Sequence, residues 1–160
     1  MANDPRFEAA AAAVSKYGSD LFRLAYSFLL EREDAQDAVQ DAFVAYMRKA
    51  PAFADERAEK AWLLRVTANR AKNMLRRSRK HPSVELKEDA AKAEGVSDVA
   101  LSLSSLPPKY RMPVHLYYYE GYSISEIALL LRRPAATVGT QLARGRELLR
   151  GILGGEYDEK

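Results

Sequence analysis

The chain has 160 residues, of which 48% are hydrophobic, and its 25 basic and 22 acidic side chains leave a formal net charge of +3. This balance excludes an acidic disordered chain and a polybasic tail, and the absence of cysteine excludes disulfides, iron–sulfur clusters, thiolate zinc sites and cysteine nucleophiles. Only two histidines are present, and no apolar run approaches the roughly 20 residues that span a bilayer. We therefore expect a cytoplasmic protein without an export signal, a metal or a cofactor.

Apolar residues recur at helical spacing through the amino-terminal part of the chain, and no segment alternates with a period of two. A first helix is expected over 6–17, with Gly18 just beyond its end. A second helix is expected to begin after Asp20 as its N-cap and to end near residues 31–33. The pattern predicts an all-α fold.

Two further helices are expected before residue 80. Asp34 is the expected N-cap of the third helix, which stops before Pro51 because proline cannot donate a backbone hydrogen bond. A short loop over 50–55 then leads to a long helix over 55–79. This helix is apolar early and basic late, and its Trp62 is expected to be a core residue.

Charge is distributed unevenly along the chain. Acidic residues gather in 31–41 and 85–98, and basic residues gather in 70–80 and 132–150. Clustered Lys and Arg are typical of nucleic-acid binding, although ordinary solvated helix faces are the alternative. The polar segment 82–100 is predicted to be a flexible linker, which at about 3.3 Å per residue reaches about 60 Å at most.

The last sixty residues predict a second helical domain. A helix is expected from Pro107 to Glu120, with Gly121 just beyond its end. Pro113 lies inside this helix, where it removes a hydrogen bond, so we expect a kink or an irregular start.

The residues after Gly121 predict a helix-turn-helix. Ser123 and Glu126 form a capping box, and a helix over 123–132 is expected to follow. Thr137 is the expected N-cap of a last helix over 138–151. Two short helices joined by a tight turn, the second rich in arginine, are typical of a DNA-binding module.

Aromatic side chains precede this motif. Tyr117, Tyr118 and Tyr119 point in different directions on a helix, so they cannot form one stacking platform. We expect one or two of them to pack under the helix-turn-helix and the rest to touch a partner. His115 is expected to be a buried or half-buried helix residue.

Three stretches together resemble the extracytoplasmic-function (group IV) sigma factors of bacterial RNA polymerase, of the sigma-70 family. The first is DAQDAVQDAF at 34–43 with Tyr46 and Arg48, and the second is KAWLLRV at 60–66 followed by NRAKN at 69–73 and Arg76-Arg77. The third comprises LPPKYR at 106–111, EGYS at 120–123, EIA at 126–128, TV at 137–138 and LARGR at 142–146. They occur in the family's order and at its spacing.

The resemblance implies a division of the chain into domains. It implies a region 2-like domain over 1–81, an acidic linker over 82–100 and a region 4-like helix-turn-helix domain over 101–160. Such a protein is an alternative sigma factor that binds core polymerase, reads the −10 and −35 promoter elements and promotes melting. It is not an enzyme, has no cofactor and acts on no small-molecule substrate.

The helix over 34–49 matches the region that in this family docks on the clamp helices of the polymerase β′ subunit, and the β flap is a second expected contact. The expected polymerase-binding residues are Asp37, Gln40, Asp41, Val44 and Arg48. From pattern alone, a solvated amphipathic helix is the alternative.

The loop and the helix that follows match the part of the family that opens the −10 element. Phe53 lies where the family captures an unstacked base, and Asn69 and Asn73 share a helix face from which their amides can reach a base edge. The residues expected to hold phosphates are Arg70, Lys72, Arg76 and Arg77. The alternative for Phe53 is a loop aromatic folded into the core.

The last helix matches the −35 recognition helix. Expected base contacts are Thr140, Gln141, Ala143, Arg144 and Arg146, and expected phosphate contacts are Thr137 and Arg111. Gly139 and Gln141 depart from the basic residues that are usual in the family, so the bases that are read stay open.

Other function classes stay open at this point. A helix-turn-helix regulator that never joins polymerase is the main alternative, and an enzyme is disfavoured because no phosphate loop, nucleophile elbow or metal-spaced motif is present. The resemblance also implies an anti-sigma factor as partner, which could hold the protein at the membrane.

Overall fold

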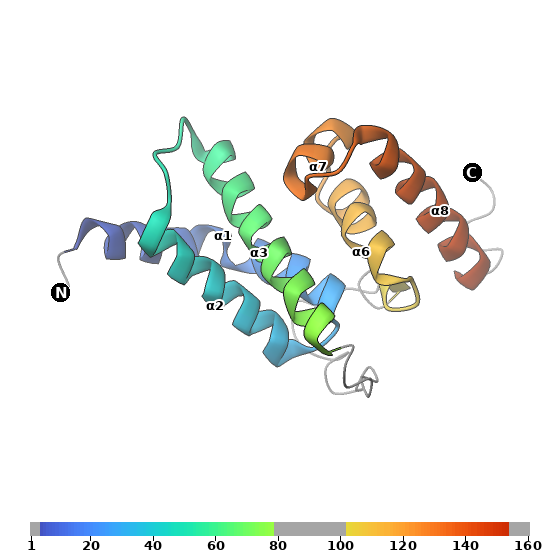
Figure 1. Cartoon of the computed structure of the whole chain (residues 1–160), viewed down its shortest axis with the longest axis horizontal. Coiled ribbons are helices and arrows are strands. Elements are labelled where there is room, and N and C mark those ends of the chain that lie inside the picture. Colours follow the sequence, from blue (N-terminus) through green and yellow to red (C-terminus); the bar gives the residue numbers. More distant parts are fainter. Residues whose placement is uncertain (1–3, 79–101, 154–160) are drawn as a thin grey trace.

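The computed structural model describes residues 4–78 and 102–153, in which helices are the only regular secondary structure. An amino-terminal group contains α1 (Pro5–Leu29), α2 (Arg32–Lys49) and α3 (Glu56–Ser78), and a carboxy-terminal group contains α6 (Pro108–Val114), the π-helix η1 (His115–Tyr119), α7 (Ile124–Leu131) and α8 (Ala135–Leu153) (Figure 1). The predicted all-α fold with two helical groups is confirmed. The predicted linker over 82–100 lies outside the described residues, and the domain boundaries stay predictions. Among the described helices, none has both the length and the apolar character to cross a membrane.

The first helix is longer than predicted. α1 continues through Gly18, so the predicted helix end there is wrong. Side chains on both sides of Gly18 lie on one buried stripe, namely Ala13, Tyr17, Leu21 and Leu24. Burial of this stripe outweighs the roughly 1 kcal/mol by which glycine disfavours a helix interior.

Two predicted N-caps are wrong because their helices begin earlier than expected. Asp20 lies inside α1, where its carboxylate forms an ion pair with Arg23 and lies 3.1 Å from Lys60 Nζ. α2 begins two residues before Asp34, and the Glu31 carboxylate accepts a hydrogen bond of 2.9 Å from the N–H of Asp34. Glu31 therefore caps α2 in place of Asp34.

The loop between α2 and α3 has the predicted position. The N–H of Ala50 donates to the carbonyl of Tyr46 at 3.2 Å, and Pro51 follows directly. At the other end, the Asp55 carboxylate accepts a 2.9 Å hydrogen bond from the N–H of Ala58 in the first turn of α3. Both ends of the loop are thus fixed by hydrogen bonds.

The helix that contains Pro113 is irregular, as predicted. α6 gives way to the π-helix η1 just after Pro113, and the N–H of Glu120 donates to the carbonyl of His115 at 3.1 Å. Gly121 follows with a φ of 81°, a left-handed conformation that glycine adopts at little cost. This turn directs the chain into the helix-turn-helix.

The helix-turn-helix is formed by α7 and α8. The capping box of Ser123 and Glu126 is present in full, which confirms that prediction. Arg132 ends α7 with a φ of 58°. α8 begins at Ala135, so Thr137 lies in its first turn and the prediction of Thr137 as N-cap is wrong.

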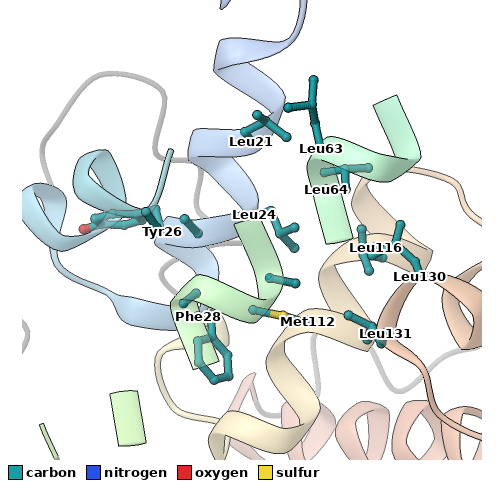
Figure 2. Packing of buried hydrophobic residues seen from close by; sticks show 14 of the residues in the cluster. Leu21, Leu24, Tyr26, Phe28, Leu63, Leu64, Met112, Leu116, Leu130 and Leu131 are labelled. Atoms are coloured by element: carbon teal, nitrogen blue, oxygen red, sulfur yellow. The ribbon is translucent and has the colours of Figure 1, made fainter. Parts of the chain in front are cut away.

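The two helical groups pack against each other through one continuous core. α1 contacts α6 and η1, and α3 contacts α7. Figure 2 shows Leu24 and Phe28 of α1 and Leu64 of α3 in the same cluster as Met112, Leu116 and Leu131 of the second group. We call this packed state the closed arrangement.

Candidate functional site

The outer face of α8 carries most of the predicted −35 residues. Thr137, Thr140, Gln141 and Arg144 line one shallow groove with Lys109, Tyr110 and Ala136. Thr137, Thr140 and Arg144 are exposed, whereas Gln141 is half-buried and accepts a 2.7 Å hydrogen bond from Arg133. The structure therefore brings four of the predicted residues onto one face of a single helix.

The remaining predicted −35 residues lie outside this groove. Ala143 and Arg146 are exposed, and an Arg146 Nη donates to the hydroxyl of Tyr118 at 2.9 Å. Arg111 lies apart from them, because its guanidinium donates to the carbonyls of Leu106 at 2.9 Å and Phe28 at 2.7 Å. Burial lowers the pKa of Arg111 to about 10. In the closed arrangement Arg111 therefore joins the two helical groups.

The predicted −10 residues lie along the second half of α3. Asn69, Arg76 and Arg77 are exposed, and Asn73 is half-buried. Arg70 donates to the carboxylate of Asp41 at 2.8 Å, which pairs a predicted DNA contact with a predicted polymerase contact. These side chains form one surface across α2 and α3.

Lys72 lies on the same helix but faces the second helical group. Burial, followed by the charges of Arg133 and Arg76, lowers the pKa of Lys72 to about 8. Arg133 belongs to the turn of the helix-turn-helix, and burial also lowers its pKa. Like charges of the two groups thus oppose the closed arrangement at this point.

Phe53 belongs to an aromatic cluster at the start of α3. Its ring is half-buried, 6.1 Å from the ring of Tyr46 and 5.9 Å from that of Trp62. Trp62 is itself half-buried and meets Tyr46 edge to face at 6.1 Å. Phe53 is therefore held against neighbouring side chains and is still partly accessible from solvent.

Sequence reasoning missed the residue that holds this cluster. One carboxylate oxygen of Glu59 accepts a 2.6 Å hydrogen bond from the hydroxyl of Tyr46, and the other accepts a 3.2 Å bond from Tyr17. A glutamate in the first turn of a helix is common for electrostatic reasons alone, so the sequence carries no signal for this contact.

The predicted polymerase-binding residues lie on one outward face of α2. Asp37, Gln40, Val44 and Arg48 are exposed, and Asp41 is half-buried beside Arg70. Val44 exposes 47% of its surface although it is apolar. The face combines one apolar side chain with charges of both signs.

Sequence reasoning also missed a polar cluster at the contact between the two groups. It consists of Asp20, Arg23, Lys60, His115 and Glu120. Glu120 Oε2 lies 3.7 Å from Arg23 Nε and 3.4 Å from His115 Nε2, and the Glu120 side chain is only 10% exposed. Burial alone would raise the pKa of Glu120, but the neighbouring His115, Arg23 and Lys60 together lower it below its ordinary value.

Aromatic rings extend this polar cluster. His115 is buried, as predicted, and stacks on Tyr119 at 5.1 Å, while the Arg23 guanidinium lies 5.5 Å from the same ring. Tyr117, Tyr118 and Tyr119 each expose more than a third of their surface. The prediction that one or two of them pack under the helix-turn-helix is therefore wrong, because Tyr119 faces Arg23 of the first group and Tyr118 reaches α8 only with its hydroxyl, which accepts from the exposed Arg146.

A groove of about 390 Å³ borders the same contact, between α3 and α7. Its polar lining includes Arg57, Lys60 and Glu126, and Arg57 and Glu126 form an exposed ion pair across the two groups. Leu129 on its rim is 73% exposed. Over 4–78 and 102–153, no cluster of acidic or histidine side chains is arranged to hold a metal ion.

Family models match both helical groups. Residues 13–81 match the family model of sigma-70 region 2, and residues 90–149 match that of sigma-70 region 4. The chain is 33% identical over 145 residues to the ECF RNA polymerase sigma factor SigM of Mycobacterium tuberculosis, covering 87% of this chain and 74% of SigM. It is 31% identical over 166 residues to SigW of Bacillus subtilis, covering 89% and 88%.

Solved structures of similar fold agree with these matches. CnrH, solved in complex with the cytosolic domain of CnrY, is 26% identical, with a TM-score of 0.70 over 95% of this chain and 92% of CnrH. The sigma factor RpoE of Bartonella quintana, solved in complex with the anti-sigma factor NepR, has a TM-score of 0.72 at 21% identity, over 91% and 97% of the two chains.

Proposed function

This chain belongs to the extracytoplasmic-function sigma factors of the sigma-70 family, and from that premise we propose how its surfaces divide the work of initiation. As an alternative sigma factor it directs transcription initiation, with RNA polymerase core and promoter DNA as partners. The observation that carries the proposal is the presence of two separate exposed faces, on α2 and on α8, within one chain that has both sigma regions.

The α2 face docks on polymerase. Its residues Asp37, Gln40, Asp41, Val44 and Arg48 would contact the clamp helices of β′, while the second helical group would contact the β flap. Exposed Val44 supplies apolar contact, and the charges around it fix the register of helix on helix. Asp41 is paired with Arg70 in the free chain, so on docking it would either leave Arg70 for a basic group of polymerase or bind both.

The groove along α8 reads the −35 element. Arg144 and Gln141 are suited to guanine and adenine edges respectively, and each such contact discriminates by about 1–3 kcal/mol. Thr140, Ala143 and Arg146 would complete the base contacts, and Thr137 near the helix N-terminus would hold a phosphate. Gln141 must release Arg133 to reach a base edge.

The loop and α3 open the −10 element. An unstacked base costs a few kcal/mol to extrude, which stacking on Phe53 and edge contacts to Asn69 and Asn73 would offset. Arg70, Lys72, Arg76 and Arg77 would hold the phosphates of the strand. The half-buried but accessible ring of Phe53 supports this role.

Binding a promoter requires the closed arrangement to open. The two promoter elements lie apart along the duplex, whereas Arg111 bonds the second group directly to Phe28 of α1. Opening would release Arg111 for a phosphate contact and would separate Lys72 from Arg133. The chain's role is to position polymerase without chemistry of its own.

An anti-sigma factor is the proposed regulator. RpoE was solved with the anti-sigma factor NepR, and CnrH with the cytosolic domain of CnrY. By this likeness, the protein works in the cytoplasm and could be held at the membrane through such a partner.

Co-elution with core polymerase on a sizing column tests the docking face. We expect the chain to co-elute with sigma-free core, and Val44→Glu to weaken the complex because it places a charge in the apolar contact. Ala12→Glu, an exposed position of α1 outside the face, serves as control. Absence of any complex would favour a DNA-binding regulator that never joins polymerase.

A further inference from the structure

A carboxylate that belongs to α3 bonds side chains of α1 and α2 near the loop over 51–55. Glu59 lies in the first turn of α3, and its two oxygens accept hydrogen bonds from the hydroxyls of Tyr17 in α1 and Tyr46 in α2. A single side chain therefore joins three helices at the base of the loop.

Tyr46 transmits this constraint to Phe53. The two rings lie 6.1 Å apart with planes inclined by 28°, and Trp62 meets both rings at their edges. A tyrosine whose hydroxyl is fixed at 2.6 Å from a carboxylate cannot rotate or tilt freely, so its ring is a fixed wall for Phe53. Phe53 is thus connected to the oxygen atoms of Glu59 through one intervening ring, that of Tyr46.

The electrostatic state of the tyrosines keeps these bonds intact. Burial, followed by the contact with Glu59, raises the pKa of Tyr46 to about 12. Burial and Glu59 also raise the pKa of Tyr17. Both hydroxyls therefore stay protonated and donate to Glu59 throughout the physiological range.

Other contacts already join α1 to α3 without touching the loop. Lys16 Nζ lies 2.5 Å from the carboxylate of Glu56, and Lys60 pairs with Asp20 at 3.1 Å. Glu56 and Glu59 lie on the same turn of α3 and both bond to α1, but Glu59 also bonds Tyr46. Glu56, whose side chain is 74% exposed, therefore offers a control for loss of a carboxylate contact to α1 on this turn.

We propose that Glu59, through Tyr46, is a positioning residue for promoter opening, because it holds Phe53 where an extruded −10 base can stack. The inference rests on the proposed role of Phe53 in base capture. Fixing the ring before DNA arrives lowers the ordering that capture itself requires, which is the general advantage of a preorganised site.

The test compares four variants as holoenzymes with core polymerase: Glu59→Gln, Tyr46→Phe, Glu56→Gln and Phe53→Ala. Opening is followed by 2-aminopurine fluorescence in the −10 element on duplex DNA and by transcript yield on a promoter that is already unpaired there. Closed-complex affinity and thermal unfolding of each free variant are measured in parallel.

We expect Tyr46→Phe, which removes the donor, to slow opening by about tenfold, as loss of a hydrogen bond to a charged group implies. We expect Glu59→Gln to slow opening in the same direction but by less, because its amide has one oxygen left to accept from the two tyrosine hydroxyls. We expect closed-complex affinity to stay within about twofold, and transcription from the unpaired promoter to be restored, because no base has to be extruded there. Glu56→Gln should open at the unaltered rate.

Separate outcomes overturn the inference and its premise. If Phe53→Ala slows opening while Glu59→Gln and Tyr46→Phe do not, the positioning role is wrong and base capture stands. If Phe53→Ala opens normally, base capture and the positioning role both fail. Equal defects on duplex and unpaired promoters, or an equal defect in Glu56→Gln, would assign Glu59 to general stability.

Discussion

Replacement of Arg23 by methionine is expected to loosen the closed arrangement. Arg23 of the first helical group lies 3.7 Å from Glu120, and its guanidinium also lies 5.5 Å from the ring of Tyr119; Lys60 of the same group is a further cation that acts on Glu120. The Glu120 side chain is only 10% exposed and lies beside His115, so the change removes a cation from a carboxylate that water barely reaches.

The magnitude follows from burial and distance. Removing one member of a fully buried ion pair costs about 3–5 kcal/mol, but the pair here is long and the Arg23 side chain is 27% exposed. We therefore expect a loss of about 2 kcal/mol, including about 0.5–1 kcal/mol for the cation–π contact. This corresponds to roughly a 30-fold shift toward separated helical groups.

Energy transfer between one dye on α2 and one on α8 of the free chain measures this shift along a urea series. Arg23→Met should move the loss of transfer to lower urea, ahead of the loss of helical signal. Arg57→Met is the control, because it also removes an ion pair between the groups, but the side chains of Arg57 and Glu126 are 78% and 37% exposed. The control is expected to lose less than about 1 kcal/mol.

Two results would refute this reasoning. An unchanged transfer midpoint in Arg23→Met would show that the buried cluster does not hold the groups together. Equal shifts in Arg23→Met and Arg57→Met would show that burial of the pair is irrelevant to its strength.

The affinity of the chain for core polymerase should rise together with this shift, by up to the same factor, because the fraction of open chains limits binding.

Three further predictions concern α8 and α3. Arg144→Ala should weaken binding to the −35 element by about 1–3 kcal/mol in competition assays, with little change on DNA that lacks the element. Gly145→Ala should lower the free energy of unfolding by about 1–3 kcal/mol, because the new Cβ would lie 2.7 Å from Val114 Cγ2. Gly139→Ala should raise the free energy of unfolding by about 0.5–1 kcal/mol, because nothing outside its own helix backbone lies within 4 Å of the new Cβ and alanine favours a helix. Changes of the same sign in urea unfolding would contradict this pair of predictions. The closed arrangement should become more stable as pH rises from 8 toward 10.5, because Lys72 loses its proton there before it would in the open chain; the same rise in Lys72→Met would contradict this assignment.

Local sequence signals predicted the secondary structure where a single residue dominates it. The capping box of Ser123 and Glu126, the stop at Pro51 and the irregularity after Pro113 are each caused by atoms within one turn of the residue concerned. Gly18 led to a wrong helix end because the free energy by which glycine disfavours a helix is small against that gained by burying Tyr17 and Leu21. That burial depends on α2 and α3, which are distant in the sequence.

The candidate site was predictable in part for the same reason. Thr137, Thr140 and Arg144 share a face because helical geometry alone places them there. The contacts of Arg111 with Phe28, and of Glu120 with Arg23, join residues far apart in the chain and arise only when the two groups pack. Glu59 was missed because both its tyrosine partners lie on other helices.

Run-off transcription with sigma-free core polymerase on a library of random promoters tests the central claim most directly. The purified chain should restore initiation at a subset of sequences that share two elements, and Arg144→Ala should relax the upstream one while Phe53→Ala lowers yield through the downstream one. Recovery of transcripts with no shared elements, or no initiation from any member of the library, would contradict the account.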